Sequence, residues 1–384
     1  MPVLDEDWKN GGFGLYIHWP FCAAKCPYCD FNSHVSAKID SDSWHKSYIS
    51  EIVRYGQETA GRTLSSVYFG GGTPSLMEPK TVGAILDEVA KTWSLSNDLE
   101  VTLEANPSSV EAARFQGFRA AGVRRVSMGF QALDDDSLRK LGRLHDVKTA
   151  MSALEVARDH FDRVSFDLIY ARQDQSLAQW EAELTWALSL QPDHLSLYQL
   201  TIEEGTAFGD RFERNKLPGL PSEDLSADMY FLTQDMTEAA GLPAYEVSNH
   251  ARDGEQSRHN LIYWRGGDYV GIGPGAHGRL TLNGQRTATW TELMPTQWLK
   301  GPKEAGREPL SRADHAGEYL MMSLRTTRGT SLGRFEAILG SPLEASKINA
   351  LEGLSLVECT GGRLRATRSG RAVLNAILAD LLPN

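Results

Sequence analysis

The stretch Tyr16-Ile17-His18-Trp19-Pro20-Phe21-Cys22-Ala23-Ala24-Lys25-Cys26-Pro27-Tyr28-Cys29 holds three of the four cysteines of the chain. Its spacing, C-x3-C-x2-C, lets one short loop present three thiolates to three irons of a four-iron cluster, which leaves the fourth iron open to a ligand. A zinc site completed by a distant histidine and three unrelated buried thiols are the alternatives. Zinc sites prefer paired C-x2-C units, which the chain lacks, so the spacing favours the cluster.

The composition describes an acidic chain that is long enough for one large barrel and an accessory domain. It has 384 residues, 41% of them hydrophobic, and a formal net charge of −11 at pH 7. A negative surface disfavours a nucleic-acid partner. Clustered cysteines suit metal binding in a reducing compartment, and no apolar run approaches the length that spans a bilayer. We therefore expect a cytoplasmic protein.

Short apolar stretches alternate with helical patterns through the first half of the chain. Repeated strand–helix units form parallel sheets with right-handed crossovers. The order therefore predicts an α/β fold with a partial, TIM-like barrel of six units, (β/α)6. The predicted strands are Gly14–Trp19, Ser66–Phe69, Leu99–Glu104, Arg125–Met128, Val164–Ile169 and His194–Gln199.

The pattern changes after about residue 205, where proline- and glycine-rich turns begin. We expect the barrel in residues 1–215, a connecting region in 216–300 and a C-terminal domain in 301–384 that begins with a linker over 301–309. The C-terminal order of elements predicts a small winged-helix-like module within an α+β accessory region. Its expected elements are helices at 313–324 and 343–351, a hairpin at 360–362 and a helix at 370–382.

Several blocks of sequence resemble the radical S-adenosylmethionine (SAM) superfamily. The cysteine spacing, with Tyr28 before the third cysteine, is similar to the signature of that superfamily. The string from Tyr16 to Cys22 resembles the oxygen-independent coproporphyrinogen III oxidases and their heme-chaperone relatives, the HemW branch. Further blocks agree in chain order: Phe69-Gly70-Gly71-Gly72-Thr73-Pro74-Ser75, Glu104-Ala105-Asn106-Pro107, Ser127-Met128-Gly129-Phe130-Gln131, Gly142-Arg143 and Asp167-Leu168-Ile169-Tyr170.

The resemblance implies a [4Fe–4S] cluster on Cys22, Cys26 and Cys29, with SAM at the open iron. It implies SAM binding by Tyr16, Tyr28, Gly71, Gly72, Thr73, Glu104, Gln131, Arg143 and Asp167. The residues alone leave other roles open. The glycine run also suits a tight turn after a strand, and Glu104 also suits a solvated rim carboxylate. Arg143 and Asp167 fit a structural ion pair equally well, and no residue is assigned a catalytic role.

Two features set the chain apart from the oxidases within this resemblance. The oxidases carry another cysteine where this chain has Phe31. The segment His259-Asn260-Leu261-Ile262-Tyr263-Trp264 resembles the H-N-x-x-Y-W signature of the heme-chaperone branch. It implies heme contact by His259, Tyr263 and Trp264, with His250 and His277 as further candidates, because a neutral imidazole is a good axial ligand. The residues alone favour a histidine in a turn with the aromatic rings in the core.

Within this resemblance the expected function is that of a heme chaperone that binds the cluster, SAM and heme and delivers heme to respiratory proteins. Its further expected partners are an electron donor for the cluster, a second copy of the chain and a peripheral membrane contact. The main alternative is an enzyme, a coproporphyrinogen dehydrogenase of the oxygen-independent type. A second alternative is a zinc-bound, non-catalytic interaction protein. The remaining cysteine, Cys359, is expected to be a small apolar residue in a C-terminal strand.

Overall fold

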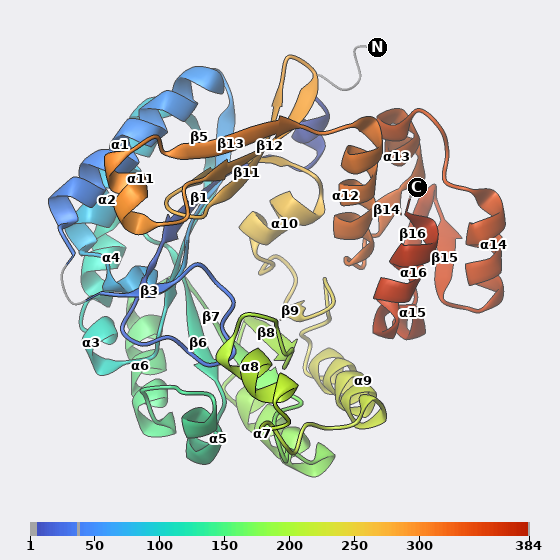
Figure 1. Cartoon of the computed structure of the whole chain (residues 1–384). Coiled ribbons are helices and arrows are strands. Elements are labelled where there is room, and N and C mark those ends of the chain that lie inside the picture. The colour runs from blue at the N-terminus through green and yellow to red at the C-terminus, as the bar shows by residue number, and fades with distance from the viewer. Residues whose placement is uncertain (1–5, 37–38, 383–384) are drawn as a thin grey trace.

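A sheet of parallel strands, curved into a partial barrel, forms the centre of the molecule in a computed structural model that describes residues 6–36 and 39–382 (Figure 1). All six predicted strands are confirmed, and they are neighbours in chain order, each parallel to the next. They are β1 (Phe13–Trp19), β4 (Thr63–Gly71), β5 (Ser94–Ala105), β6 (Arg125–Gln131), β7 (Arg163–Tyr170) and β8 (His194–Gln199).

Helices between these strands cover the outer face of the sheet (Figure 1). In α2 (Pro79–Thr92), Val82, Ile85 and Val89 are buried, because their spacing places them on one helix face. The other helices of this half are α1 (Ser41–Glu58), α3 (Ser109–Ala112), α4 (Phe115–Ala121), α5 (Asp135–Lys140), α6 (Val147–His160), α7 (Leu177–Ser189), α8 (Ala207–Glu213) and α9 (Glu223–Ala239).

Segments beyond residue 216 extend the same sheet at both edges. On one side, β10 (Asp268–Ile272) pairs in parallel with β1, and an antiparallel meander follows. On the other side, β9 (Asn249–Ala251) pairs antiparallel with β8. The meander consists of β11 (His277–Leu282), β12 (Gln285–Thr291) and β13 (Glu304–Pro309), with α11 (Pro295–Lys300) before the last strand.

Two of these edge strands were hard to see in the sequence. The expected linker over 301–309 is wrong over its last six residues, because Glu304–Pro309 pairs with β12 as the outermost strand β13. In β10, Gly271 interrupts the apolar pattern. A Cβ atom there would lie 2.1 Å from the carbonyl oxygen of His277, so the neighbouring strand leaves room only for glycine.

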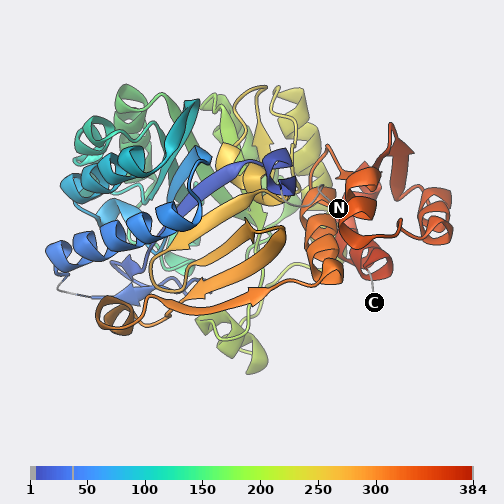
Figure 2. The ribbon, with the colours of Figure 1, turned by 90° about the horizontal axis from the view of Figure 1, so that it is seen from above.

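The C-terminal module stands beside the barrel and has a hydrophobic cluster of its own (Figure 2). Its small sheet has the order β14 (Thr330–Ser331), β16 (Arg363–Ala366), β15 (Val357–Thr360), as expected for a winged-helix-like module. The expected helix over 370–382 is divided, because Val373 leaves helical geometry at φ −119° and ψ 29°. The elements are α12 (Arg312–Leu324), β14 (Thr330–Ser331), α13 (Leu332–Leu339), α14 (Ala345–Gly353), β15 (Val357–Thr360), β16 (Arg363–Ala366), α15 (Arg368–Ala372) and α16 (Leu374–Leu381).

The expected domain boundaries at 215 and 300 stay a prediction. Cys359 lies in β15, as expected for a strand residue, but its side chain is exposed. Within residues 6–36 and 39–382, no helix combines the length and the apolar character needed to cross a membrane.

Candidate functional site

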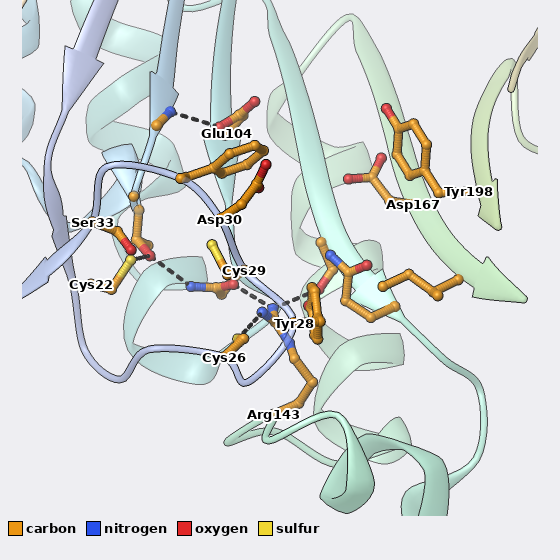
Figure 3. Close-up of a pocket in the computed structure, with 18 of the residues that line it drawn as sticks. Cys22, Cys26, Tyr28, Cys29, Asp30, Ser33, Glu104, Arg143, Asp167 and Tyr198 are labelled. Carbon is orange, nitrogen blue, oxygen red and sulfur yellow. Dashed lines mark hydrogen bonds between the residues drawn. The ribbon is translucent and has the colours of Figure 1, made fainter. Parts of the chain in front are cut away.

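A cavity of about 530 Å³ opens where the parallel strands end (Figure 3). The carboxyl ends of barrel strands are the usual place for an active site, and this volume suits a ligand of the size of SAM. All three clustered cysteines line the cavity. So do eight of the nine residues expected to bind SAM: Tyr28, Gly71, Gly72, Thr73, Glu104, Gln131, Arg143 and Asp167.

Tyr16 is the ninth of these residues, and it is not among those lining the cavity. Its hydroxyl is hydrogen-bonded to Nδ1 of His18 at 3.1 Å, and its ring stacks on Tyr68. Its ring also stacks on that of His259, at 6.2 Å between centroids. In this structure Tyr16 therefore belongs to an aromatic layer in the barrel interior.

The cysteine loop is held at both ends and in the middle. It leaves from β2 (Phe21–Cys22) and returns through β3 (His34–Val35), and these two short strands pair with each other. In the middle, Pro27 packs on Gly142, where a Cβ atom would lie 2.6 Å from the proline ring. Gly142 also has a φ of 71°, which favours glycine. The Gly142-Arg143 block thus supports the cysteine loop by packing against it.

Two of the thiols are hydrogen-bonded by the barrel. The Cys22 sulfur accepts from the Thr73 hydroxyl at 3.4 Å, and the Cys26 sulfur accepts from Nη1 of Arg143 at 3.4 Å. Burial raises the pKa of the Cys22 and Cys29 thiols above the usual value. Both are therefore protonated at neutral pH in the metal-free protein, and metal binding must displace the protons.

The donor set fits an iron–sulfur cluster. Three free thiols line one wall of the same cavity, facing the carboxylates across it. Among the residues described, no three histidine, cysteine, aspartate or glutamate side chains are grouped so that they could hold a single metal ion. A [4Fe–4S] cluster takes each thiolate on a different iron, so separated thiols suit it.

The glycine run after β4 has a steric reason at two positions. Gly71 has a φ of 112°, and a Cβ atom there would lie 2.6 Å from the His18 ring. At Gly72 a Cβ atom would lie 2.8 Å from the Phe21 carbonyl oxygen and 3.0 Å from the Cys22 sulfur. The run is therefore needed as a tight turn, and that turn also brings bare backbone to the cavity next to a thiol.

Two carboxylates line the cavity, Glu104 from the end of β5 and Asp167 from within β7. Glu104 accepts hydrogen bonds from the Tyr68 hydroxyl at 2.8 Å and from the Gly71 backbone N–H at 3.1 Å. Burial raises the pKa of Glu104 to about 7, and nearby Asp167 adds to the shift. Burial also raises the pKa of Asp167 to about 6. Negative charge is thus poorly solvated here, so a cationic ligand group would be attracted.

Arg143 also lines the cavity and binds the cysteine loop. Within the described residues it forms no ion pair with Asp167, although the sequence left that pair open. Its Nη2 donates instead to the Asn106 side-chain oxygen and to the Gly129 carbonyl, the latter at 2.8 Å. The guanidinium therefore ties Cys26 to the ends of β5 and β6.

Replacing Glu104 with glutamine is expected to stabilise the metal-free protein at alkaline pH. A carboxyl group whose folded pKa is raised contributes stability below pH 4.5, and that contribution is lost as pH rises through about 7. The variant should be more stable by roughly 2 kcal/mol at pH 8 and about equal to the parent near pH 4.5. Urea unfolding at several pH values measures the difference.

The control is Asp162→Asn, at an exposed ion pair with Arg119. Its free energy of unfolding, compared with that of the parent, should not change with pH above pH 5. A flat profile for the glutamine variant would contradict the prediction.

None of the heme candidates lines the thiol-lined cavity. His259 is in α10 (Arg258–Trp264), which packs against β1, β4 and β10, and its ring is buried. Its Nδ1 is hydrogen-bonded to the Ser66 hydroxyl at 2.7 Å and its Nε2 to the Tyr263 hydroxyl at 2.5 Å. Burial lowers its pKa to about 3, so the imidazole is neutral with both nitrogens occupied. The aromatic rings are packed, as the residue chemistry alone favoured, but His259 lies in a helix and not in the expected turn.

The remaining heme candidates differ in access. His250 is buried in β9, with Nδ1 hydrogen-bonded to the Thr237 hydroxyl at 3.0 Å. Trp264 packs edge-on against Tyr245. His277, at the start of β11, is the exposed one of the three histidines. Burial lowers the pKa of His18 to about 4, and the charge of His277 adds to this shift, so the two histidines are neighbours.

Some residues of the cavity were not singled out from the sequence. Tyr198 and Gln199 line it from the end of β8, and Asn106 lines it just after β5. The sequence did contain a signal for these residues, because they end or follow predicted strands. The active sites of barrels are built at the ends of the strands. Asp30 and Ser33 also line it from the cysteine loop, as Figure 3 shows.

Comparisons with known proteins agree with this geometry. Residues 16–187 match the radical SAM superfamily and residues 310–373 match the HemN C-terminal domain. The chain is 38% identical to the mitochondrial radical S-adenosyl methionine domain-containing protein 1 of Bos taurus, over 96% of this chain and 87% of that protein. It is 36% identical to heme chaperone HemW of Escherichia coli, over 95% of this chain and 96% of that protein.

A solved structure shares the fold over nearly the whole chain. Coproporphyrinogen III oxidase (HemN) from Escherichia coli has a TM-score of 0.79, covering 99% of this chain and 93% of that one, at 21% identity. The structural likeness shows the fold, while the identity to the HemW proteins over most of both chains shows the branch. The chain belongs to the radical SAM superfamily and, within its coproporphyrinogen III oxidase-like family, to the HemW heme-chaperone branch.

Proposed function

We propose that this protein is a cytoplasmic heme chaperone that holds a [4Fe–4S] cluster and SAM and delivers heme to respiratory acceptor proteins. The observation that carries the proposal is the identity of 36% to HemW of Escherichia coli along almost the entire length of both chains. The thiol-lined cavity and Phe31, at the position of the extra oxidase cysteine, support it. An electron donor for the cluster, a second copy of the chain and a peripheral membrane contact belong to the same proposal.

The cavity supplies distinct roles for its residues in this proposal. Cys22, Cys26 and Cys29 would hold the cluster, and Arg143 positions Cys26. When bound, the cluster supplies the electron that reductively cleaves SAM. Glu104 and Asp167 face the place where a cationic ligand group would be held, as their raised pKa values indicate. The Gly71–Thr73 backbone borders the same space.

For the heme we propose His277 as the first ligand to test, because an axial ligand needs an accessible ring nitrogen. The ring of His277 is exposed, whereas those of His250 and His259 are buried and hydrogen-bonded. His259 can take this role only if α10 moves away from Ser66 and releases the ring. With His277 as the ligand, the role of the signature around His259 is to hold α10 in place against the barrel.

A heme titration tests the ligand. His277→Ala is expected to weaken heme binding at least tenfold and to shift the heme absorbance bands, because one coordination bond is lost. His34→Ala is the matched control, since His34 is another accessible histidine at the cysteine loop, hydrogen-bonded to the Asn32 side chain. Unchanged affinity and spectra for His277→Ala would remove His277 from the proposal.

An anaerobic assay tests the function itself. Reconstituted, reduced protein is given SAM and coproporphyrinogen III, and separately heme and an apo-acceptor protein. The chaperone proposal expects heme transfer without formation of protoporphyrinogen IX. Robust porphyrinogen turnover would establish the oxidase alternative instead, and zinc without sulfide in the purified protein would exclude both.

A further inference from the structure

A second cavity lies between the barrel and the C-terminal module, and it shares no lining residue with the thiol-lined cavity. Its volume is about 150 Å³. It is bordered by the end of α10, by α12 and by the small sheet of the module. Four arginines line it, and none of its described lining residues is acidic: Arg265, Arg328, Arg334 and Arg363.

One of these arginines is already neutralised. Arg334 binds the Asp7 carboxylate through Nε at 2.8 Å and Nη2 at 2.6 Å. It also donates to the Gly266 carbonyl oxygen, and it stacks over the Tyr319 ring at 4.4 Å. Arg334 therefore joins the N-terminal segment, the end of α10 and the module, and it needs no further anion.

The other three lack an anionic partner within the described part of the chain. Nε of Arg265 is buried and has no hydrogen-bond partner there. Arg363 donates to one neutral group, the Gly329 carbonyl oxygen, at 3.1 Å. Burial and the charges of Arg328 and Arg363 lower the pKa of Arg265, and burial and Arg328 lower that of Arg363. Three cations thus repel one another in a protein whose net charge is −11.

We propose that this cavity is a binding site for an oxyanion, a phosphate or carboxylate group, held by Arg265, Arg328 and Arg363. Planar guanidinium groups bind both kinds of oxyanion through paired hydrogen bonds, and the bound charge offsets the repulsion among the arginines. The volume accepts an anionic group and excludes a macrocycle, so a larger ligand would insert only its charged end. The site joins the barrel to the module, and Trp264, one of the expected heme contacts, also lines it, but the proposal rests on the arginines alone.

Calorimetric titration of the full-length, metal-free protein with inorganic phosphate at constant ionic strength tests this site. We expect saturable binding that is at least tenfold weaker in the double variant Arg265→Gln/Arg363→Gln. Arg368→Gln is the matched control, because Arg368 is an exposed arginine of the same module, paired with Asp235. A second variant, Arg328→Gln, replaces an exposed side chain, so it should fold like the parent even where the double variant does not. It should also weaken binding.

A parallel titration with acetate separates the two ligand groups. Binding of phosphate alone assigns a phosphoryl ligand, and binding of acetate alone assigns a carboxylate. Binding of both, lost in the arginine variants, assigns a general oxyanion site. If neither anion binds saturably, or if the double variant binds as the parent does, the proposal is overturned.

Discussion

Replacing Cys22, Cys26 and Cys29 together with serine is expected to remove nearly all bound iron and acid-labile sulfide. The parent protein, reconstituted without oxygen, should carry about four irons per chain, because three thiolates anchor a [4Fe–4S] cluster. The triple variant should retain less than about one tenth of that iron, since the chain has no other thiols near the cavity and serine is a poor ligand for iron. Iron and sulfide analysis with the visible absorbance spectrum measures the loss.

The chain supplies a matched control in its fourth cysteine. Cys359 is exposed in β15, far from the cavity, so Cys359→Ser should keep the full iron and sulfide content. The circular dichroism spectrum of the triple variant should match that of the parent, because the barrel core does not depend on the thiols. Iron retained in the triple variant, or lost in Cys359→Ser, would show that the cluster is held elsewhere.

The cysteine loop also shows how far the sequence could lead. Contiguous motifs located the three thiols, the glycine turn and Glu104, because each motif carries its own geometric requirement. The bond between Arg143 and the Cys26 sulfur could not be predicted, since 117 positions separate the two residues. From the motif alone, Arg143 fitted a ligand contact and an ion pair with Asp167 equally well. Only the folded chain shows that it holds the loop.

The fold, like the site, could be predicted from the sequence only in part. Six buried strands were visible as apolar runs, and they are all found. Strand β13 was not, because Glu304–Pro309 is a polar and largely exposed edge strand with no apolar signal. The histidine of α10 shows the same limit for function. Its signature pointed to heme, but the sequence could not show that Ser66 and Tyr263 occupy both ring nitrogens.

The substitution His259→Ala is expected to lower the free energy of unfolding by about 3–4 kcal/mol. The ring is 1% exposed and stacks on Tyr68 at 4.8 Å between centroids. Its removal leaves a cavity and also leaves the Ser66 and Tyr263 hydroxyls without their partner. Urea unfolding at pH 7.5 measures the loss. His277→Ala, at an exposed position, should change the stability by less than about 0.5 kcal/mol.

The pH dependence of this loss tests the same packing. The folded pKa of His259 is lowered to about 3 from its usual value of 6.5, so the ring contributes its full stability above pH 6.5. That contribution is lost as pH falls from 6.5 towards 3, because the unfolded chain then binds a proton that the folded chain excludes. The difference in the free energy of unfolding between the parent and His259→Ala should therefore become smaller as pH falls below 6.5. An unchanged stability together with lost heme binding would instead mean that the ring is accessible and that α10 opens in solution.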